Sequence, residues 1–355
     1  MFNILFLSRY SRLGSSSRLR LYQYLPYLQD AGIDPTLAPF FGDDYVRGIY
    51  GGKIAKLPIL KAYFDRLRFM LEAGRFDAVW VEKEMLPWIP AWLELELFPA
   101  KLPLIVDYDD AVFHRYDQHR FSLVRGLLGR KIDRVMQRAD LVVTGNEYLA
   151  SRARNAGASR VEILPTVVDM ARYGVASPVS GAQQLPVIGW IGSPLTAKYL
   201  NLIAPALQEI ISRKLARVIV VGGNANLLDG MPVEVLPWTE ATEVNDIQGF
   251  DIGIMPLPDS PFERGKCGYK LIQYMACGKA VVASPVGVNS TIVRDGVNGF
   301  LASTPQEWAN ALTRLLAEPE LRQQMGKEGR LRIENEYSLQ QAAPRLVKLI
   351  ESVLR

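Results

Sequence analysis

The acidic side chains that follow the apolar run Leu104–Val106 are the first candidates for chemistry. The segment L-I-V-D-Y-D-D-A-V-F-H places Asp107, Asp109 and Asp110 close together, and His114 follows four residues later. Carboxylates this close repel one another unless a cation, a backbone N–H or a ligand compensates them. The cluster could do electrostatic or acid–base work, hold a metal ion, or cap a helix with structural hydrogen bonds. His114 could be catalytic or structural.

A second candidate is the stretch from Pro261 to Pro285, P-F-E-R-G-K-C-G-Y-K-L-I-Q-Y-M-A-C-G-K-A-V-V-A-S-P. It predicts a basic loop, a helix over about Gly268–Ala276, a Cys-Gly break and a buried strand over Ala280–Ser284. The start of a helix offers unpaired backbone N–H groups and a positive dipole end to an anion. The segment is therefore an anion-binding candidate; the alternative is an ordinary loop with solvated cations. The side chains that add positive charge are Arg264, Lys266 and Lys270.

Two further loops follow predicted strands. The run V-I-G-W-I-G-S-P-L-T-A-K predicts a strand ending at Gly192, followed by Ser193 and Lys198 before a helix. Lys198 could bind phosphate as a point charge, or Ser193 could simply cap the helix. Near the start of the chain, Gly14 and Ser15 begin a small polar loop, G-S-S-S, before another helix. This loop has neither the G-x-G-x-x-G nor the P-loop pattern.

Short apolar runs alternate with helical patterns in both halves of the chain, which indicates right-handed βαβ crossovers and parallel sheets. The polar, Pro-rich stretch Val175–Pro186 predicts a boundary between two similar α/β halves. The fold class is therefore α/β, with two Rossmann-like domains whose loops face a central cleft. Helices are expected over Leu19–Ala31, with a kink at Pro26, and over Ile59–Ala73. The expected strands are Asn3–Ser8, Ala78–Val81, Leu104–Asp107, Leu141–Thr144, Val161–Leu164, Val187–Ile191, Val218–Val221, Val233–Leu236, Ile252–Met255 and Ala280–Ser284.

Composition narrows the class of protein. The chain has 355 residues, 49% of them hydrophobic and 22% charged, which is typical of a globular protein with two domains. Cys267 and Cys277 are the only cysteines, so neither a disulfide framework nor a zinc site is expected. No apolar run is long enough to span a membrane, and the start M-F-N-I-L-F-L-S resembles a strand more than a signal peptide. We therefore expect a cytoplasmic protein.

Positive charge is concentrated in one segment. Residues 1–175 carry 24 Lys and Arg against 20 Asp and Glu, whereas the remainder is balanced. Between His119 and Arg138, six basic residues face only Asp133, and apolar residues interleave with them at helical spacing. This pattern predicts an amphipathic helix that either has a solvated basic face or contacts anionic lipid headgroups at the inner face of the cell membrane. Nucleic acid is not expected as a partner, because no binding motif is present.

The run Y-M-A-C-G-K-A-V-V-A-S resembles the donor-site signature of glycosyltransferases of family 4, which have the GT-B fold. The resemblance covers most of the chain and is strongest over Gly189–Leu301. It implies an N-terminal acceptor-side domain over residues 1–175, a donor-binding domain over 176–337, and a helix over 338–355 that returns to the first domain.

The resemblance also implies roles for individual residues. Lys198 falls on the family's diphosphate-binding Lys, and Ser193 replaces the Arg of that motif. The two acids of the family's Glu-x7-Glu pattern fall on Gly265 and Gln273, with Glu263 two residues before the first. The second acid usually binds ribose in the family, so the resemblance implies a ribose contact for Gln273. Asp109 and Asp110 fall on the family's His-Asp pair. The implied catalytic residues are Asp109, Asp110 and His114. The implied donor-binding residues are Gly14, Ser15, Gly192, Ser193, Lys198, Glu263, Arg264, Gly265, Lys266, Lys270 and Gln273.

The resemblance implies a retaining, metal-independent transfer of a sugar from a nucleoside diphosphate to an acceptor hydroxyl, in surface polysaccharide or glycolipid biosynthesis. No cofactor is expected besides the nucleotide sugar as co-substrate, and a lipid-linked acceptor is one alternative. Two other functions are compatible with the residues. A sugar-nucleotide epimerase of the same architecture would need acid and base groups at the Asp107–Asp110 cluster. A two-domain sugar-binding protein would have no catalytic groups.

Overall fold

Two compact units make up the chain. The computed structural model describes residues 1–50, 56–175, 185–228 and 230–354. The first unit contains Met1–Thr166, Arg264–Cys267 and Leu339–Arg355, and the second contains Val167–Glu263 and Gly268–Ser338. The boundary predicted at Val175–Pro186 falls mostly on residues 176–184, which lie outside the described residues. The short segment Arg264–Cys267 belongs to the first unit although it interrupts the second in sequence.

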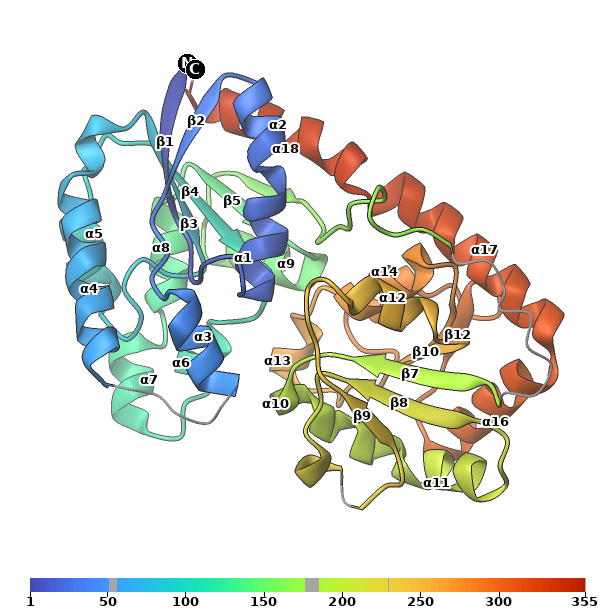
Figure 1. Cartoon of the computed structure of the whole chain (residues 1–355). Coiled ribbons are helices and arrows are strands. Elements are labelled where there is room, and N and C mark those ends of the chain that lie inside the picture. The colour runs from blue at the N-terminus through green and yellow to red at the C-terminus, as the bar shows by residue number, and fades with distance from the viewer. Residues whose placement is uncertain (51–55, 176–184, 229, 355) are drawn as a thin grey trace. The chain divides into compact units, whose positions relative to one another are not determined.

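The first unit is built on a six-stranded parallel sheet with the strand order β2-β1-β3-β4-β5-β6. Strands β3, β4 and β5 are buried along their whole length, as expected for a parallel sheet covered on both faces. Figure 1 shows α4 and α5 on one side of this sheet and α2 and α18 on the other. The strands are β1 (Phe2–Leu7), β2 (Ile33–Leu37), β3 (Ala78–Glu82), β4 (Leu104–Tyr108), β5 (Leu141–Thr144) and β6 (Val161–Ile163).

Ten α-helices accompany this sheet among the described residues. The last of them, α18, contacts α2, so the end of the chain packs within the first unit. The helices are α1 (Ser15–Arg20), α2 (Leu25–Asp30), α3 (Asp43–Tyr50), α4 (Lys56–Leu71), α5 (Ala91–Glu96), α6 (His114–Asp117), α7 (Ser122–Leu128), α8 (Lys131–Arg138), α9 (Glu147–Asn155) and α18 (Leu339–Leu354).

Two helices predicted as continuous are broken, so those predictions were wrong in extent. The stretch Leu19–Ala31 contains the end of α1, a 3₁₀ turn at Tyr22–Tyr24, and α2. Pro26 lies in the first turn of α2, where its missing N–H costs nothing, and it begins a helix instead of kinking one. The basic segment His119–Arg138 is likewise two helices, α7 and α8, with Gly129 and Arg130 between them.

The second unit repeats the architecture with the strand order β12-β11-β10-β7-β8-β9, again entirely parallel. Its strands are β7 (Val187–Ile191), β8 (Arg217–Val221), β9 (Glu234–Leu236), β10 (Ile252–Met255), β11 (Ala280–Ala283) and β12 (Gly299–Leu301). Its helices are α10 (Pro194–Ala197), α11 (Ala204–Ser212), α12 (Glu243–Gln248), α13 (Pro261–Arg264), α14 (Tyr269–Ala276), α15 (Asn289–Ile292), α16 (Pro305–Ala317) and α17 (Pro319–Glu336).

Two strands were missed by the sequence patterns, and both are edge strands. Strand β2 has the sequence I-D-P-T-L, in which Asp34 and Pro35 interrupt the apolar pattern. An edge strand tolerates proline because one of its sides needs no backbone donor. Strand β12 is only three residues long. The ten strands that were predicted are all present, with ends that differ by at most one residue.

Candidate functional site

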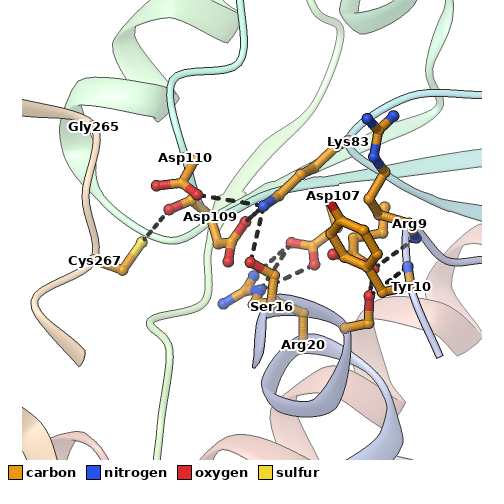
Figure 2. A network of polar contacts seen from close by, with 12 residues as sticks. Arg9, Tyr10, Ser16, Arg20, Lys83, Asp107, Asp109, Asp110, Gly265 and Cys267 are labelled. Atoms are coloured by element: carbon orange, nitrogen blue, oxygen red, sulfur yellow. Dashed lines mark hydrogen bonds and ion pairs between the residues drawn. The ribbon is translucent and has the colours of Figure 1, made fainter. Parts of the chain in front are cut away.

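Lys83 is the centre of a charged cluster at the carboxyl ends of β3 and β4 (Figure 2). Its ammonium lies 2.9 Å from Asp109 Oδ1 and 3.3 Å from Asp110 Oδ2, and it donates a hydrogen bond to Ser16 Oγ at 2.9 Å. Lys83 has a positive φ of 66°, a backbone conformation that residues other than glycine adopt only at some energetic cost. The strained backbone therefore aims one buried cation at two adjacent carboxylates.

This ion cluster determines the charge of its members. Burial opposes ionisation of Asp109, but the Lys83 ammonium and a hydrogen bond from Ser16 outweigh it and hold the pKa of Asp109 below its ordinary value. Burial also opposes charge on Lys83, yet Asp109 and Asp110 raise the pKa of Lys83. Asp110 keeps 27% of its side chain exposed, compared with 11% for Asp109. Asp110 is therefore the carboxylate that a ligand can reach more easily.

Asp107 is turned into the fold and has a structural partner. Arg20 of α1 donates to both Asp107 oxygens and also to the Leu164 carbonyl oxygen. Both side chains are almost fully buried. Among the described residues, no group of three or more Cys, His, Asp or Glu is arranged to hold a metal ion. Asp107 therefore serves to join β4 to α1, separately from Asp109 and Asp110.

The serines predicted to form a loop before a helix are instead the first turn of α1, and two of them bond to the same strand end. Ser17 donates to Glu82 Oε2 at 2.5 Å, while Ser16 accepts from Lys83. Burial, only partly offset by Lys83, raises the pKa of Glu82 to about 7. Of the residues predicted here, Ser15 is exposed at the start of α1. A Cβ on Gly14 would lie 2.3 Å from Tyr10 Cβ, so this glycine is needed for close packing whether or not it approaches a ligand.

Both ring nitrogens of His114 have partners. Nδ1 lies 2.8 Å from Asp117 Oδ1, and Nε2 lies 2.8 Å from Tyr148 Oη. The side chain is only 8% exposed. The geometry therefore brings Asp109 and Asp110 together around Lys83 but gives His114 a separate hydrogen-bonded position. Its predicted catalytic role stays a prediction.

The segment Arg264–Cys267 is anchored within the first unit by Asn146. This side chain caps α9 through Oδ1, and its Nδ2 donates to the carbonyl oxygens of Gly265 at 2.9 Å and Lys266 at 3.1 Å. The Cys267 thiol donates to the Asp109 carbonyl oxygen at 3.1 Å (Figure 2). Burial raises the pKa of Cys267 to about 12, which keeps the thiol protonated as a donor. Lys266 reaches back to Asp110 Oδ1 at 3.8 Å.

Close packing explains why glycine occupies position 265, where the resemblance places an acid. A Cβ on Gly265 would lie 2.5 Å from the Ala111 Cβ and 2.9 Å from the Ala111 backbone nitrogen. Glutamate at this position would have to displace the chain immediately after Asp110. Glu263 does not replace the missing acid at a solvent-accessible position. Its side chain is buried, and its carboxylate accepts hydrogen bonds from Tyr199 and Ser260. Arg264 is exposed.

In the second unit, Gly192 lies where β7 meets the first turn of α14. A Cβ on Gly192 would lie 2.6 Å from the Trp190 ring and 2.7 Å from Lys270 Cε. The Lys270 ammonium lies 5.2 Å from the centre of the Trp190 ring, within cation–π range. Gly268 precedes α14 with φ of 66°, and a Cβ there would lie 2.4 Å from Ile292 Cδ1. The two glycines thus allow a tight approach of strand, helix start and cation.

Ser193 and Lys198 lie on the connection that follows Gly192. Ser193 precedes α10 without capping it through its side chain, and its Oγ lies 3.2 Å from Thr196 Oγ1. Lys198 is exposed at the start of a 3₁₀ helix, Lys198–Ile203, with its ammonium 5.7 Å from the Tyr199 ring centre. Tyr199, the residue after Lys198, donates a hydrogen bond to Glu263 of α13.

Gln273 is buried in α14 and belongs to a hydrogen-bonded chain. Its Nε2 donates to Tyr173 Oη at 2.9 Å, and Tyr173 Oη donates to Glu243 Oε1 at 3.2 Å. All three side chains are less than 4% exposed. The family resemblance pointed to Gln273 as a donor-binding residue, but it gave no indication of Tyr173 or Glu243.

Sequence reasoning missed Lys83, Glu82, Asn146, Tyr173 and Glu243. A usable signal existed for the first two. The run E-K-E begins at the last residue of the buried strand β3, and ligands usually bind at the carboxyl ends of parallel strands. Asn146 had the weaker signal of a polar residue after β5. Nothing local distinguished Tyr173 or Glu243.

Comparison with known proteins supports the architecture. A sucrose-phosphate synthase from Thermosynechococcus elongatus superposes with a TM-score of 0.76 at 15% identity, with 99% of each chain covered. HepE from Anabaena, in complex with UDP-glucose, superposes with a TM-score of 0.73 at 18% identity, with 99% of this chain and 100% of that chain covered. Two six-stranded parallel sheets of this kind define the GT-B fold.

Sequence comparison finds a family match in the second half of the chain. Residues 185–318 match the model of the glycosyl transferases group 1. A D-inositol 3-phosphate glycosyltransferase from Thermobifida fusca is 26% identical over 232 residues, which cover 56% of this chain and 52% of the relative. The chain spans about half the length of the curated relatives it matches.

Proposed function

We propose that the protein is a retaining glycosyltransferase that moves a sugar from a nucleoside diphosphate to an acceptor hydroxyl. The observation that carries this proposal is the meeting of β7, Lys270 and the start of α14 at Gly192, with Lys198 on the connection that follows. This combination of cations with the positive end of a helix dipole suits an anionic diphosphate. A nucleotide sugar is bound by the structural neighbour from Anabaena, which supports the same ligand class here.

In the proposed reaction, the bond between the anomeric carbon and the diphosphate oxygen breaks, and its electron pair leaves with the diphosphate. The acceptor oxygen forms a bond to the same face of the anomeric carbon, and the acceptor proton passes to the leaving diphosphate oxygen. Lys198, Lys266 and Lys270 stabilise the growing negative charge, which is the main source of catalysis in this scheme. Asp110 orients the acceptor hydroxyl, and Asp109 shares the Lys83 cation with it.

The decisive experiment is incubation with a panel of UDP-, GDP- and ADP-sugars, with release of nucleoside diphosphate as the readout. Release that depends on an added acceptor, with a product of unchanged anomeric configuration, supports the proposal. Conversion of one nucleotide sugar into its epimer without release would instead identify an epimerase. Binding without either reaction would identify a sugar-binding protein.

We further propose that α7 places the enzyme on the inner face of the cell membrane, where a glycolipid or polysaccharide precursor would supply the acceptor. Phe121, Leu123 and Leu127 are 54%, 80% and 58% exposed, and Arg120, Arg125, Arg130 and Arg134 are exposed in the same segment. No helix among the described residues is long and apolar enough to cross a membrane. Exposed apolar side chains with adjacent arginines suit the surface of an anionic bilayer.

Fewer basic side chains of the segment His119–Arg138 are exposed in the structure than the sequence pattern predicts. Lys131 does not contribute to the basic face, because it is buried and its ammonium lies 2.7 Å from Glu94 Oε2. Arg138 donates to the carbonyl oxygens of Ala100 and Leu102. The attraction therefore comes from four arginines, each contributing about 1 kcal/mol near an anionic surface.

Sedimentation with phosphatidylglycerol vesicles at low and high salt tests the membrane proposal. The protein should pellet with anionic vesicles at low salt, less so at high salt, and not with neutral vesicles. Leu123→Glu should reduce pelleting, whereas Leu331→Glu, at an exposed position of α17, is the matched control. Equal pelleting of the two variants would contradict a role for α7.

A further inference from the structure

The chain Gln273–Tyr173–Glu243 has a direction that chemistry determines. Glu243 is a carboxylate and can only accept, so the Tyr173 hydroxyl must donate its single proton to Glu243 Oε1 at 3.2 Å. The Tyr173 oxygen can then only accept from Gln273. The amide group of Gln273 donates only through its NH₂, so Nε2 is the atom that faces Tyr173 at 2.9 Å.

This direction leaves a defined atom of Gln273 for a ligand. Since Nε2 is turned to Tyr173, the carbonyl oxygen Oε1 is the atom on the other side of the amide. Oε1 accepts no hydrogen bond from any residue in the described part of the chain, and it is not sealed off as a buried orphan. A fixed acceptor with this chemistry suits a sugar hydroxyl and is unsuited to a carbonyl or phosphate oxygen.

Glu243 is itself held on both sides. Trp238 Nε1 donates to Glu243 Oε2 at 3.2 Å, and an Arg172 guanidinium nitrogen lies 3.5 Å from Oε1. The Tyr269 hydroxyl lies 3.3 Å from the Tyr173 oxygen and can serve only as a second donor to it. The carboxylate therefore cannot turn away from Tyr173 without losing that hydrogen bond and disturbing the contacts with Trp238 and Arg172. The chain joins α12 to α14 through the loop residue Tyr173.

We propose that Glu243 is a positioning residue for the nucleotide sugar, which through Tyr173 locks the Gln273 amide so that Oε1 faces the ribose hydroxyls. This inference rests on the proposed function. In this arrangement the negative charge lies three hydrogen bonds away from the ribose, whereas the family pattern has it on the side chain at position 273. The two arrangements share one requirement, an acceptor atom held toward the ribose.

The test compares binding of a nucleoside diphosphate with binding of its 2′,3′-dideoxy analogue. The probe is whichever of UDP, GDP and ADP the wild-type protein binds most tightly. The wild type should prefer the ribose form, and Tyr173→Phe and Glu243→Gln should each reduce that preference roughly three- to tenfold, the value of about one hydrogen bond. Tyr274→Phe is the matched control in α14, because it removes a buried hydroxyl that bonds only backbone groups of β7 and β10.

Moving the carboxylate from position 243 to position 273 distinguishes an effect on ligand positioning from an effect on protein stability alone. Gln273→Glu places two carboxylates on one tyrosine proton and should lower the melting temperature. Adding Glu243→Gln to it removes the conflict, so the double variant should regain both the melting temperature and the ribose preference. If Tyr173→Phe and Glu243→Gln still bind the diphosphate and keep the ribose preference of the wild type, this inference is overturned, whereas the proposed function is not affected. A wild-type protein that binds none of the three diphosphates would overturn the proposed function and this inference with it.

Discussion

The two units hold their candidate residues by different means. At the ends of β3 and β4 in the first unit, opposite charges lie in direct contact, with Lys83 between Asp109 and Asp110. In the second unit, Gln273 is connected through a neutral hydroxyl to Glu243, and no ion pair is made by Gln273 itself. The first unit thus relies on charge, and the second on the direction of hydrogen bonds.

The difference predicts two kinds of sensitivity. A buried ion that loses its partner is left uncompensated in a medium of low polarity, so single substitutions in the Lys83 cluster should be costly for stability. The hydrogen-bonded chain in the second unit joins the neutral Gln273 and Tyr173 side chains to the Glu243 carboxylate. Substitution of a neutral member removes about one hydrogen bond at a time, and the change should be visible mainly in ligand selectivity. Four predictions test this contrast.

The largest effect is expected for Lys83→Met. It leaves Asp109, Asp110 and the adjacent Glu82 without their shared cation, and should reduce the free energy of unfolding by about 3–5 kcal/mol. Urea unfolding measures the loss, with Lys61→Met on the exposed face of α4 as control. Equal stability of the two variants would show that the cluster is not held by charge.

The second prediction concerns pH and Glu82. Burial raises the pKa of Glu82 to about 7, whereas the unfolded chain has a value of about 4.3. Between these values the folded protein binds the proton more tightly, so unfolding releases it and the free energy of unfolding falls as pH rises. Each unit of pKa corresponds to about 1.4 kcal/mol, so the loss is on the order of 3 kcal/mol.

Glu82→Gln should remove this loss, because the amide can still accept the hydrogen bond from Ser17 but does not ionise. Urea unfolding at pH 5 and pH 8 should therefore show the variant gaining stability relative to the wild type at pH 8. Glu209→Gln, at an exposed site of α11, is the control and should follow the wild type. Parallel pH profiles for the wild type and Glu82→Gln would contradict the prediction.

A smaller effect is expected for the lysines assigned to the diphosphate. Lys198→Ala and Lys266→Ala should each weaken binding of a nucleoside diphosphate by about 1.5–3 kcal/mol, the range for a hydrogen bond to a charged group. Calorimetric titration measures the change, and Lys327→Ala on the exposed face of α17 should leave it unaltered. Full affinity in both site variants would remove them from the donor site.

The smallest effect is expected for Gln273→Ala. Loss of one neutral hydrogen bond to ribose should weaken binding of the nucleoside diphosphate by about 1 kcal/mol and leave binding of inorganic pyrophosphate unchanged. Gln324→Ala, exposed on α17, is the control. A loss of equal size for pyrophosphate would show that Gln273 acts on the diphosphate or on the fold, and a nucleotide complex with Gln273 turned from the ribose would refute the contact.

Local pattern was sufficient for much of the fold. A continuous apolar run of four to six residues between loops is buried in almost any parallel sheet, and most of the ten predicted strands have this pattern. The two strands that were missed, β2 and β12, lie at sheet edges, where burial is incomplete and the apolar pattern is weak. The start of α14 after Gly268 was also predictable, because loop composition and helical periodicity change at that residue.

The sequence by itself thus determined the α/β class, the parallel strands and the resemblance to glycosyltransferases over residues 185–318, since each follows from short-range periodicity or from a contiguous motif. Tertiary structure alone decided which charges are paired. The sequence pattern places Lys131 on a basic surface, yet it is buried against Glu94, which lies 37 positions earlier. The direction of the Gln273 amide depends on Tyr173, 100 positions away. Electrostatic and hydrogen-bond partners are chosen by distance in space, and a one-dimensional pattern does not contain that distance.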